Sequence, residues 1–191
     1  MTAKVEFFYD YVSTYSYLAN SQLGRLDAEI IYRPMFLGAV MEATGNRPPG
    51  TVEAKRKYLF ADIERWAKQY SIPFAMNPIF PQNTIKALRL ALVSQQQGTF
   101  DLIHQPLFDA MWVQQLDLSD ESVLTGIITD AGLSAHDMLQ RITMDDIKGE
   151  LKANTAEVIS RGAFGAPTFF VGEEMFFGND RFEFIVEAIS R

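Results

Sequence analysis

Short runs of apolar and aromatic residues mark the N-terminal part of the chain. One run covers residues 5–9, and a second covers residues 29–33 and is followed by Pro34. Runs this short, rich in β-branched and aromatic residues, are typical of buried strands. Apolar residues between positions 18 and 26 recur at helical spacing. This part of the sequence therefore predicts a β-α-β unit with a right-handed crossover.

The middle of the chain has a different pattern, because apolar positions recur there at helical spacing from Thr51 to about Arg161. Before it, residues 44–50 contain two prolines and two glycines, which predicts a loop. The predicted helices cover residues 52–67, 83–97, 100–116, 120–131, 134–141 and 145–161. We expect no strand in this stretch.

The C-terminal part returns to short apolar runs, at residues 168–171 and 174–177. Gly172 and Glu173 between them have the spacing of a tight hairpin, and residues 180–189 predict a closing helix. The order β-α-β, helices, β-β-α predicts an α/β fold, a thioredoxin-like sheet interrupted by a helical insertion. We expect a thioredoxin-like domain at residues 1–40 and 160–191 and a helical insertion domain at residues 41–159.

Composition limits the possible functions. The 191 residues carry a formal net charge of −7, which argues against a nucleic-acid partner. The chain has no cysteine, so it has no disulfide, no thiolate metal site and no cysteine nucleophile. We expect no membrane partner, because no apolar run approaches the ~18 residues of a membrane span. No apolar signal segment precedes the first strand, so we expect a cytoplasmic protein.

Two turns contain residues suited to chemistry. The first strand runs into a helix through Asp10 to Ser13, and a helix N-terminus with free N–H groups favours an anion. The alternative is that Ser13 or Thr14 only caps this helix. In the second turn, a cis bond at Ala166–Pro167 would turn the Ala166 N–H and C=O toward an extended peptide. We predict the cis bond, and the alternative there is an ordinary trans proline.

Several motifs together resemble a known family. They are Phe8-Tyr-Asp-Tyr-Val-Ser13, Tyr15-Ser-Tyr-Leu-Ala19, Gly45-Asn-Arg-Pro-Pro-Gly50, Lys55, Arg161-Gly-Ala-Phe-Gly-Ala-Pro167 and Phe177-Gly-Asn-Asp-Arg181. In this order they resemble the 2-hydroxychromene-2-carboxylate isomerases and kappa-class glutathione transferases, which have DsbA-like thioredoxin folds. The resemblance implies glutathione as cofactor, a small aromatic substrate and a homodimer. The residues it assigns to glutathione are Ser13, Asn46, Lys55, Ala166, Pro167, Asn179 and Asp180.

The same resemblance implies a role for each end of glutathione. Ser13 is the catalytic residue beside the sulfur, where a hydroxyl donor favours the thiolate. Asn179 and Asp180 lie at the γ-glutamyl end, although either could simply cap the last helix. Asn46 and Lys55 lie near the glycyl carboxylate, although Lys55 could simply belong to a solvated helix face. Many relatives have proline where this chain has Thr14, which could cap the helix instead.

We therefore predict a glutathione-dependent isomerase for 2-hydroxychromene-2-carboxylate or a similar aromatic carboxylate, in which the thiolate adds to the substrate and later leaves. Two alternatives remain: a kappa-like transferase that conjugates electrophiles, and a non-catalytic peptide-binding module on a thioredoxin scaffold. A serine–histidine hydrolase is disfavoured, because His104 and His136 both lie in the predicted insertion without an orienting partner. We expect both histidines to be surface or packing residues.

Overall fold

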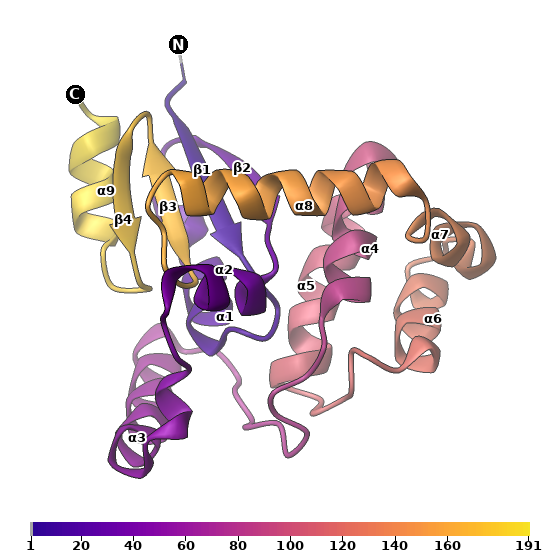
Figure 1. Cartoon of the computed structure of the whole chain (residues 1–191), viewed down its shortest axis with the longest axis horizontal. Helices are drawn as coiled ribbons and strands as arrows, with labels where there is room; N and C mark the ends of the chain where they lie inside the picture. The colour runs from indigo at the N-terminus through magenta and orange to yellow at the C-terminus, as the bar shows by residue number, and fades with distance from the viewer. Residues whose placement is uncertain (1) are drawn as a thin grey trace.

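The computed structural model describes residues 2–191. Within them, four strands form one sheet in the order β2-β1-β3-β4 (Figure 1). The strands are β1 (Lys4–Tyr9), β2 (Glu29–Pro34), β3 (Thr168–Val171) and β4 (Glu174–Phe177). β1 pairs parallel to β2 and antiparallel to β3, and β4 pairs antiparallel to β3. The sheet is therefore mixed, and it joins the two ends of the chain as the sequence predicted.

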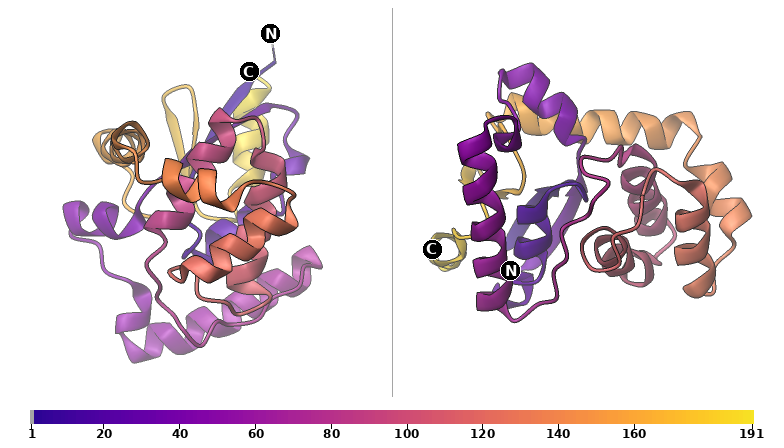
Figure 2. Two further views of the ribbon diagram at one scale, coloured as in Figure 1. Left: turned by 90° about the vertical axis from the view of Figure 1, so that its right-hand side faces the viewer. Right: turned by 90° about the horizontal axis from the view of Figure 1, so that it is seen from below.

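The helices lie where the sequence predicted them in the middle of the chain, with ends that differ by a few residues. The helices of residues 2–191 are α1 (Thr14–Asn20), α2 (Leu37–Thr44), α3 (Glu53–Tyr70), α4 (Ile85–Gln96), α5 (Phe100–Trp112), α6 (Glu121–Asp130), α7 (Ala135–Arg141), α8 (Asp145–Ser160) and α9 (Phe182–Ile189). Short 3-10 turns lie at Leu23–Arg25 and Pro49–Thr51. α8 runs from the end of the molecule near α7 back to the sheet, as Figures 1 and 2 show.

Three further differences from the sequence prediction concern α1, α2 and α9. α2 was not predicted, and its first amides are bonded by side chains from distant segments. The Leu37 N–H donates to Asp10 and the Phe36 N–H donates to Thr155, partners 27 and 119 positions away. The first helix ends at Asn20 instead of continuing to residue 26, and the last begins at Phe182 instead of residue 180. Such ends depend on tertiary contacts that a local pattern does not contain.

Side chains alternate between the two faces of the sheet and enter two different clusters. Phe7 and Tyr9 lie in the larger cluster, with residues of α4, α5 and α9. Phe8 and Phe170 lie in a smaller cluster on the opposite face, with residues of α2 and α8. Helices therefore cover both faces, and the loops at the carboxyl end of β1 are left to form a site.

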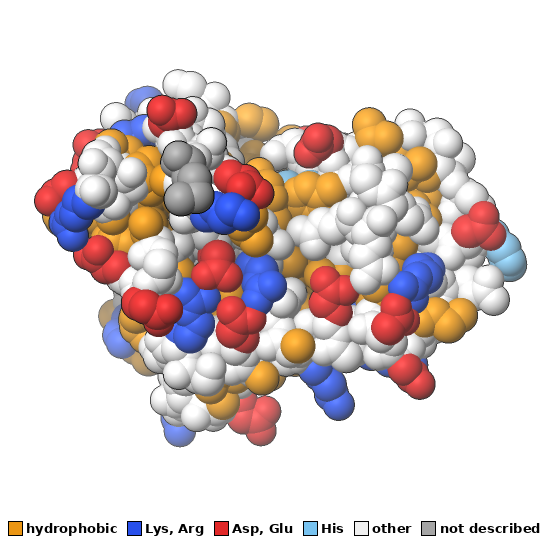
Figure 3. All heavy atoms as spheres, turned by 90° about the horizontal axis from the view of Figure 1, so that it is seen from above, with side chains coloured by type: hydrophobic (Ala, Val, Ile, Leu, Met, Phe, Trp, Pro, Cys, Tyr) orange, Lys and Arg blue, Asp and Glu red, His pale blue; other side chains and the backbone are white. Residues whose placement is uncertain are grey.

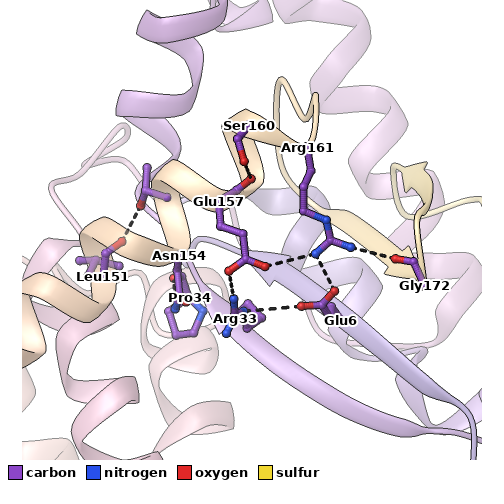
Figure 4. A network of polar contacts seen from close by, with 10 residues as sticks. Glu6, Arg33, Pro34, Leu151, Asn154, Glu157, Ser160, Arg161 and Gly172 are labelled. Carbon is purple, nitrogen blue, oxygen red and sulfur yellow. Dashed lines mark hydrogen bonds and ion pairs between the residues drawn. The ribbon is translucent and has the colours of Figure 1, made fainter.

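A network of charged side chains ties α8 to the sheet (Figure 4). Arg161 donates to Glu6 at 2.6 Å and to the Gly172 carbonyl at 2.9 Å. Glu157 accepts from both Arg161 and Arg33. The Arg161 guanidinium also lies 3.6 Å from the ring centre of Phe170. The loop that follows α8 therefore begins from a fixed point, next to β1 and the β3–β4 hairpin.

The surface is mixed in charge on the face seen from above, where acidic and basic side chains are interspersed (Figure 3). Within residues 2–191, no helix is both long and apolar enough to cross a membrane. The expectations of no nucleic-acid partner, a cytoplasmic location and a homodimer stay predictions, as does the division into two domains.

Candidate active site

Ser13 occupies the turn between β1 and α1 and is the N-cap of α1. Its Oγ accepts a hydrogen bond from the Ser16 N–H at 3.1 Å and donates one to the Ala166 carbonyl, also at 3.1 Å. The side chain is buried. Thr14 is already helical, so the suggestion that it could cap the helix is wrong. The hydroxyl of Ser13 thus joins the first turn of α1 to the loop before β3.

The Ala166–Pro167 peptide bond is cis, which confirms the prediction. Its surroundings differ in one respect from those expected. The Ala166 carbonyl does not simply face outward, because it accepts the hydrogen bond from Ser13. The Ala166 N–H donates to no acceptor within residues 2–191. The loop therefore keeps a backbone donor for an extended ligand, beside the Ser13 hydroxyl.

Asn46 contacts the same loop two residues before Ala166. Its Nδ2 donates to the Phe164 carbonyl at 2.7 Å. Gly165 follows, and a Cβ there would lie 2.8 Å from the ring of Phe177, so a side chain at this position would displace that ring. The rings of Phe164 and Phe177 are 4.5 Å apart. Ser13 and Asn46 therefore donate to two carbonyl oxygens of the same loop, those of Ala166 and Phe164.

Asn179 and Asp180 lie in the turn after β4, next to the same loop, because the Gly178 N–H donates to the Pro167 carbonyl at 3.1 Å. The Asn179 carbonyl accepts from the Tyr70 hydroxyl at 2.8 Å, which ties the turn to the end of α3. Asp180 pairs with Arg181 at 2.5 Å. Neither Asn179 nor Asp180 caps α9, whose N-cap is Arg181, so that alternative is wrong.

Lys55 lies in the first turn of α3. Together with Tyr15, Ala54, Tyr58 and Leu59 it lines an open hollow of about 430 Å³. The Tyr15 hydroxyl donates to Asp62 at 2.8 Å and so joins α1 to α3. Burial, together with this bond to Asp62, raises the pKa of Tyr15, which keeps the phenol protonated. Within the described residues, no hydrogen bond or ion pair joins Lys55 to Ser13 or to the loop before β3 that Ser13 bonds.

Asp10, which was not predicted as a site residue, lies directly behind this site and is fully buried. Its Oδ1 accepts from the Val12 N–H at 3.1 Å and from the Thr84 hydroxyl at 2.5 Å. Its Oδ2 accepts from the Leu37 N–H at 2.9 Å. Burial raises the pKa of Asp10 to about 6, although the three hydrogen bonds lower it. The only local feature of the sequence that pointed to Asp10 is that an acidic residue directly follows an apolar strand.

The two histidines take no part in the site. His104 is buried, and its ring nitrogens lie 2.9 Å from the Tyr11 hydroxyl and 2.9 Å from the Asn20 amide oxygen. Burial lowers the pKa of His104 to about 3, so the ring is neutral. His136 is exposed. The expectation that both are packing or surface residues is confirmed, and no serine–histidine pair forms among the described residues.

Comparison with known proteins places this arrangement in a family. Residues 4–190 match the model of the DSBA-like thioredoxin domain. A 2-hydroxychromene-2-carboxylate isomerase from Sphingobium xenophagum is 31% identical over 97% of both chains. Glutathione S-transferase kappa 1 from Caenorhabditis elegans is 28% identical over 98% of this chain and 91% of that protein. A solved 2-hydroxychromene-2-carboxylate isomerase structure superposes with a TM-score of 0.89 at 27% identity, covering 98% of this chain and 95% of that one.

The chain therefore belongs to the family of DSBA-like thioredoxin domains, and within it to the group that contains the 2-hydroxychromene-2-carboxylate isomerases and kappa glutathione transferases. Both relatives carry the names of enzymes, an isomerase and a transferase. The predicted thioredoxin-like sheet with a helical insertion is confirmed.

Proposed function

We propose that the protein is a glutathione-dependent isomerase acting on 2-hydroxychromene-2-carboxylate or a similar aromatic carboxylate. The observation that carries the proposal is the Ser13 hydroxyl at the N-terminus of α1, bonded to the loop of a cis-proline. The chain has no cysteine of its own, so thiol chemistry at this position needs a thiol from a ligand. Two relatives named above as isomerases support this choice of reaction.

The residues present fit glutathione. The first amides of α1, at Thr14 and Tyr15, have no acceptor within residues 2–191, and they favour an anion. The Ala166 N–H offers a donor to the extended peptide part of the ligand. When bound, glutathione supplies a thiolate that can add to an activated double bond and leave again unchanged.

Ser13 holds and activates this sulfur. A serine hydroxyl without an adjacent base is a poor nucleophile, and no histidine contacts Ser13 among the described residues. The hydroxyl proton, which points to the Ala166 carbonyl in this structure, would turn to the thiolate. A hydrogen bond to the charged form, together with the α1 N-terminus, lowers the pKa of the thiol.

Other residues hold the two ends of the tripeptide. Asn46 and Lys55 would bind the glycyl carboxylate, Lys55 from the beginning of α3. The turn of Asn179 and Asp180 would bind the γ-glutamyl head, with backbone amides for its carboxylate and Asp180 for its ammonium group. Because Asp180 pairs with Arg181 in this structure, the ligand ammonium would replace or share that partner.

A second candidate is a transferase that leaves glutathione on an electrophile. The specific observation in its favour is the 28% identity with a kappa glutathione transferase over nearly the whole chain. The two candidates share the thiolate site and differ in what happens to glutathione. Isomerisation regenerates it, whereas conjugation consumes it.

The test is Ser13→Ala, with Ser16→Ala as the matched control in the same helix. Ser16 is buried and its hydroxyl has no partner among the described residues, so the control should keep its activity. With glutathione and a chromene carboxylate, we expect Ser13→Ala to lose one to two decades of rate, since a hydrogen bond to a charged group contributes ~1.5–3 kcal/mol.

Assaying free glutathione in the same reaction separates the candidates. Isomerised product with glutathione unchanged supports the isomerase, and a conjugate supports the transferase. No reaction at all, with a peptide bound instead, supports a non-catalytic peptide-binding module. Turnover by Ser13→Ala equal to that of Ser16→Ala would refute the proposed role of Ser13.

A further inference from the structure

The carboxylate of Asp10 is fully buried, and no ion pair within residues 2–191 includes it. A buried carboxylate without a cation is costly unless hydrogen bonds compensate it. Here three donors converge on it: the Val12 N–H, the Leu37 N–H and the Thr84 hydroxyl. These three hydrogen bonds stabilise the carboxylate form and partly offset the cost of its burial.

Two of these donors connect Asp10 to two different segments of the site, the Ser13 turn and the beginning of α2. Val12 directly precedes Ser13, and the Ser13 N–H also donates to the Asp10 backbone carbonyl at 3.0 Å. Leu37 is the first residue of α2, whose last turn leads through Gly45 to Asn46. Asn46 in turn donates to the Phe164 carbonyl, in the same loop whose Ala166 carbonyl accepts from Ser13. One carboxylate thus sets the relative position of Ser13 and the beginning of α2.

The third donor belongs to a different part of the fold. Thr84 is the N-cap residue of α4, in the helical middle of the chain, and its hydroxyl reaches only the Oδ1 atom of Asp10. Its loss would leave the bonds to Val12 and Leu37 in place. A substitution can therefore remove the bond from Thr84, or it can remove a bond from Val12 or Leu37. Only the second kind of substitution breaks the link between the Ser13 turn and α2.

We propose that Asp10 is a positioning residue for glutathione, whose ionised carboxylate fixes the Ser13 turn against the beginning of α2 so that the thiol and glycyl ends of the ligand are bound together. The proposal rests on the proposed function, because it needs glutathione at this site. Asp10 itself is buried behind the turn and would not touch the ligand.

The experiment compares Asp10→Asn with Thr84→Val. In Asp10→Asn the amide presents its NH₂ group either to the Leu37 N–H or to the Val12 N–H, so one bond of the link is replaced by two facing donors. In Thr84→Val only the hydroxyl donor is lost. Glutathione affinity is measured by calorimetry for the wild type and both variants, and unfolding by urea shows that each variant is folded.

We expect Asp10→Asn to weaken glutathione binding by about ten-fold or more, and Thr84→Val by less than about three-fold, since only the first breaks a bond of the link. Equal weakening by the two variants, or none by Asp10→Asn, would overturn the positioning role. Absence of glutathione binding by the wild type would instead overturn the proposed function.

A second measurement applies if Asp10→Asn does not fold. In the wild type, a glutathione titration followed by NMR reports the backbone amides of Val12 and Leu37 separately. Because one carboxylate accepts from both, we expect both amide resonances to shift when glutathione binds. A shift of the Val12 amide without the Leu37 amide would contradict the link.

Discussion

At the scale of single residues, two buried side chains have pKa values displaced in opposite senses. Burial raises the pKa of Asp10 from 3.8 to about 6 and lowers the pKa of His104 from 6.5 to about 3. The native state therefore binds a proton on Asp10 more tightly than the unfolded chain does, and binds one on His104 less tightly. The stabilisation linked to Asp10 is present below pH 3.8 and lost as the pH rises through about 6. That linked to His104 is present above pH 6.5 and lost as the pH falls toward 3.

Between about pH 4 and 6 these two trends cancel, which gives a prediction for Asp10→Asn. Without Asp10, only the contribution of His104 remains of the pair. The free energy of unfolding should then fall by about 1.4 kcal/mol per pH unit more steeply on acidification than in the wild type. Urea unfolding of both proteins across this range measures the difference, in which the exposed carboxylates common to both cancel. Parallel curves for the two proteins would show that Asp10 does not titrate in this window.

The residues of the candidate site differ in how far the sequence could predict them. Ser13 stands between an apolar strand and a helix, so a capping position was predictable from local pattern. The local pattern around Pro167 allowed both isomers, and the cis prediction also needed the proposed fold, which sets this loop opposite Ser13. The role of Asp10 depends on Leu37 and Thr84, which are distant in sequence. No spacing within the chain indicates such a contact, because the fold alone brings these segments together.

At the scale of elements, amphipathic helices of the insertion were predictable because each has a long apolar stripe that faces the core. α2 has only eight residues, and its beginning is held by side chains of other segments. The turn before α9 was misplaced for a similar reason. Gly178 has a φ of 106°, and the Tyr70 hydroxyl bonds the Asn179 carbonyl, so the chain turns for two further residues before the helix begins.

This turn carries a prediction about ligand recognition. Asp180 suits a ligand that brings a cation, and the γ-glutamyl head brings an ammonium group beside its carboxylate. We expect Asp180→Asn to weaken glutathione binding by ~1.5–3 kcal/mol, the range for a charge-assisted hydrogen bond, or about ten- to a hundred-fold. Folding should change little, because Arg181 is the N-cap and the Asp180–Arg181 pair is exposed.

The control for that prediction is a glutathione analogue that lacks the α-amino group. It should bind the wild type poorly and lose almost nothing further in Asp180→Asn. Calorimetric titration of both ligands against both proteins gives the four affinities. If the substitution costs the two ligands equally, Asp180 acts as a long-range charge and the γ-glutamyl assignment fails.

At the scale of the whole molecule, one hydrophobic cluster runs from the sheet into the helices. It includes Phe7 and Phe169 from the strands and Trp112 from α5. The Trp112 indole donates to the Tyr11 carbonyl at 2.8 Å, next to the site. The sequence predicted the order of sheet and helices, but it could not show that they share a core, because residues far apart in the chain supply the two sides. This shared core provides a rigid support for the turn of Asp10 and Ser13.

A shared core predicts that the sheet and the helices unfold together. Phe108 lies at the centre of this core, with ring centres 4.7 Å from Tyr11, 5.2 Å from His104 and 5.9 Å from Tyr9. We expect Phe108→Ala to lower the free energy of unfolding by about 3–5 kcal/mol, the range for a buried aromatic ring. Phe184→Ala on α9 is the matched control, because that ring is 57% exposed and its loss should matter little. In a Trp66→Phe background, Trp112 fluorescence reports the surroundings of Trp112 in α5, while far-ultraviolet circular dichroism reports the whole chain. We expect the urea transitions followed by fluorescence and by dichroism to coincide, both with Phe108 present and in Phe108→Ala. Phe108→Ala should shift the two transitions together to lower urea concentration. A fluorescence transition that precedes the loss of dichroism would mean that the helical part unfolds separately, and that the site is not supported by a single cooperative core.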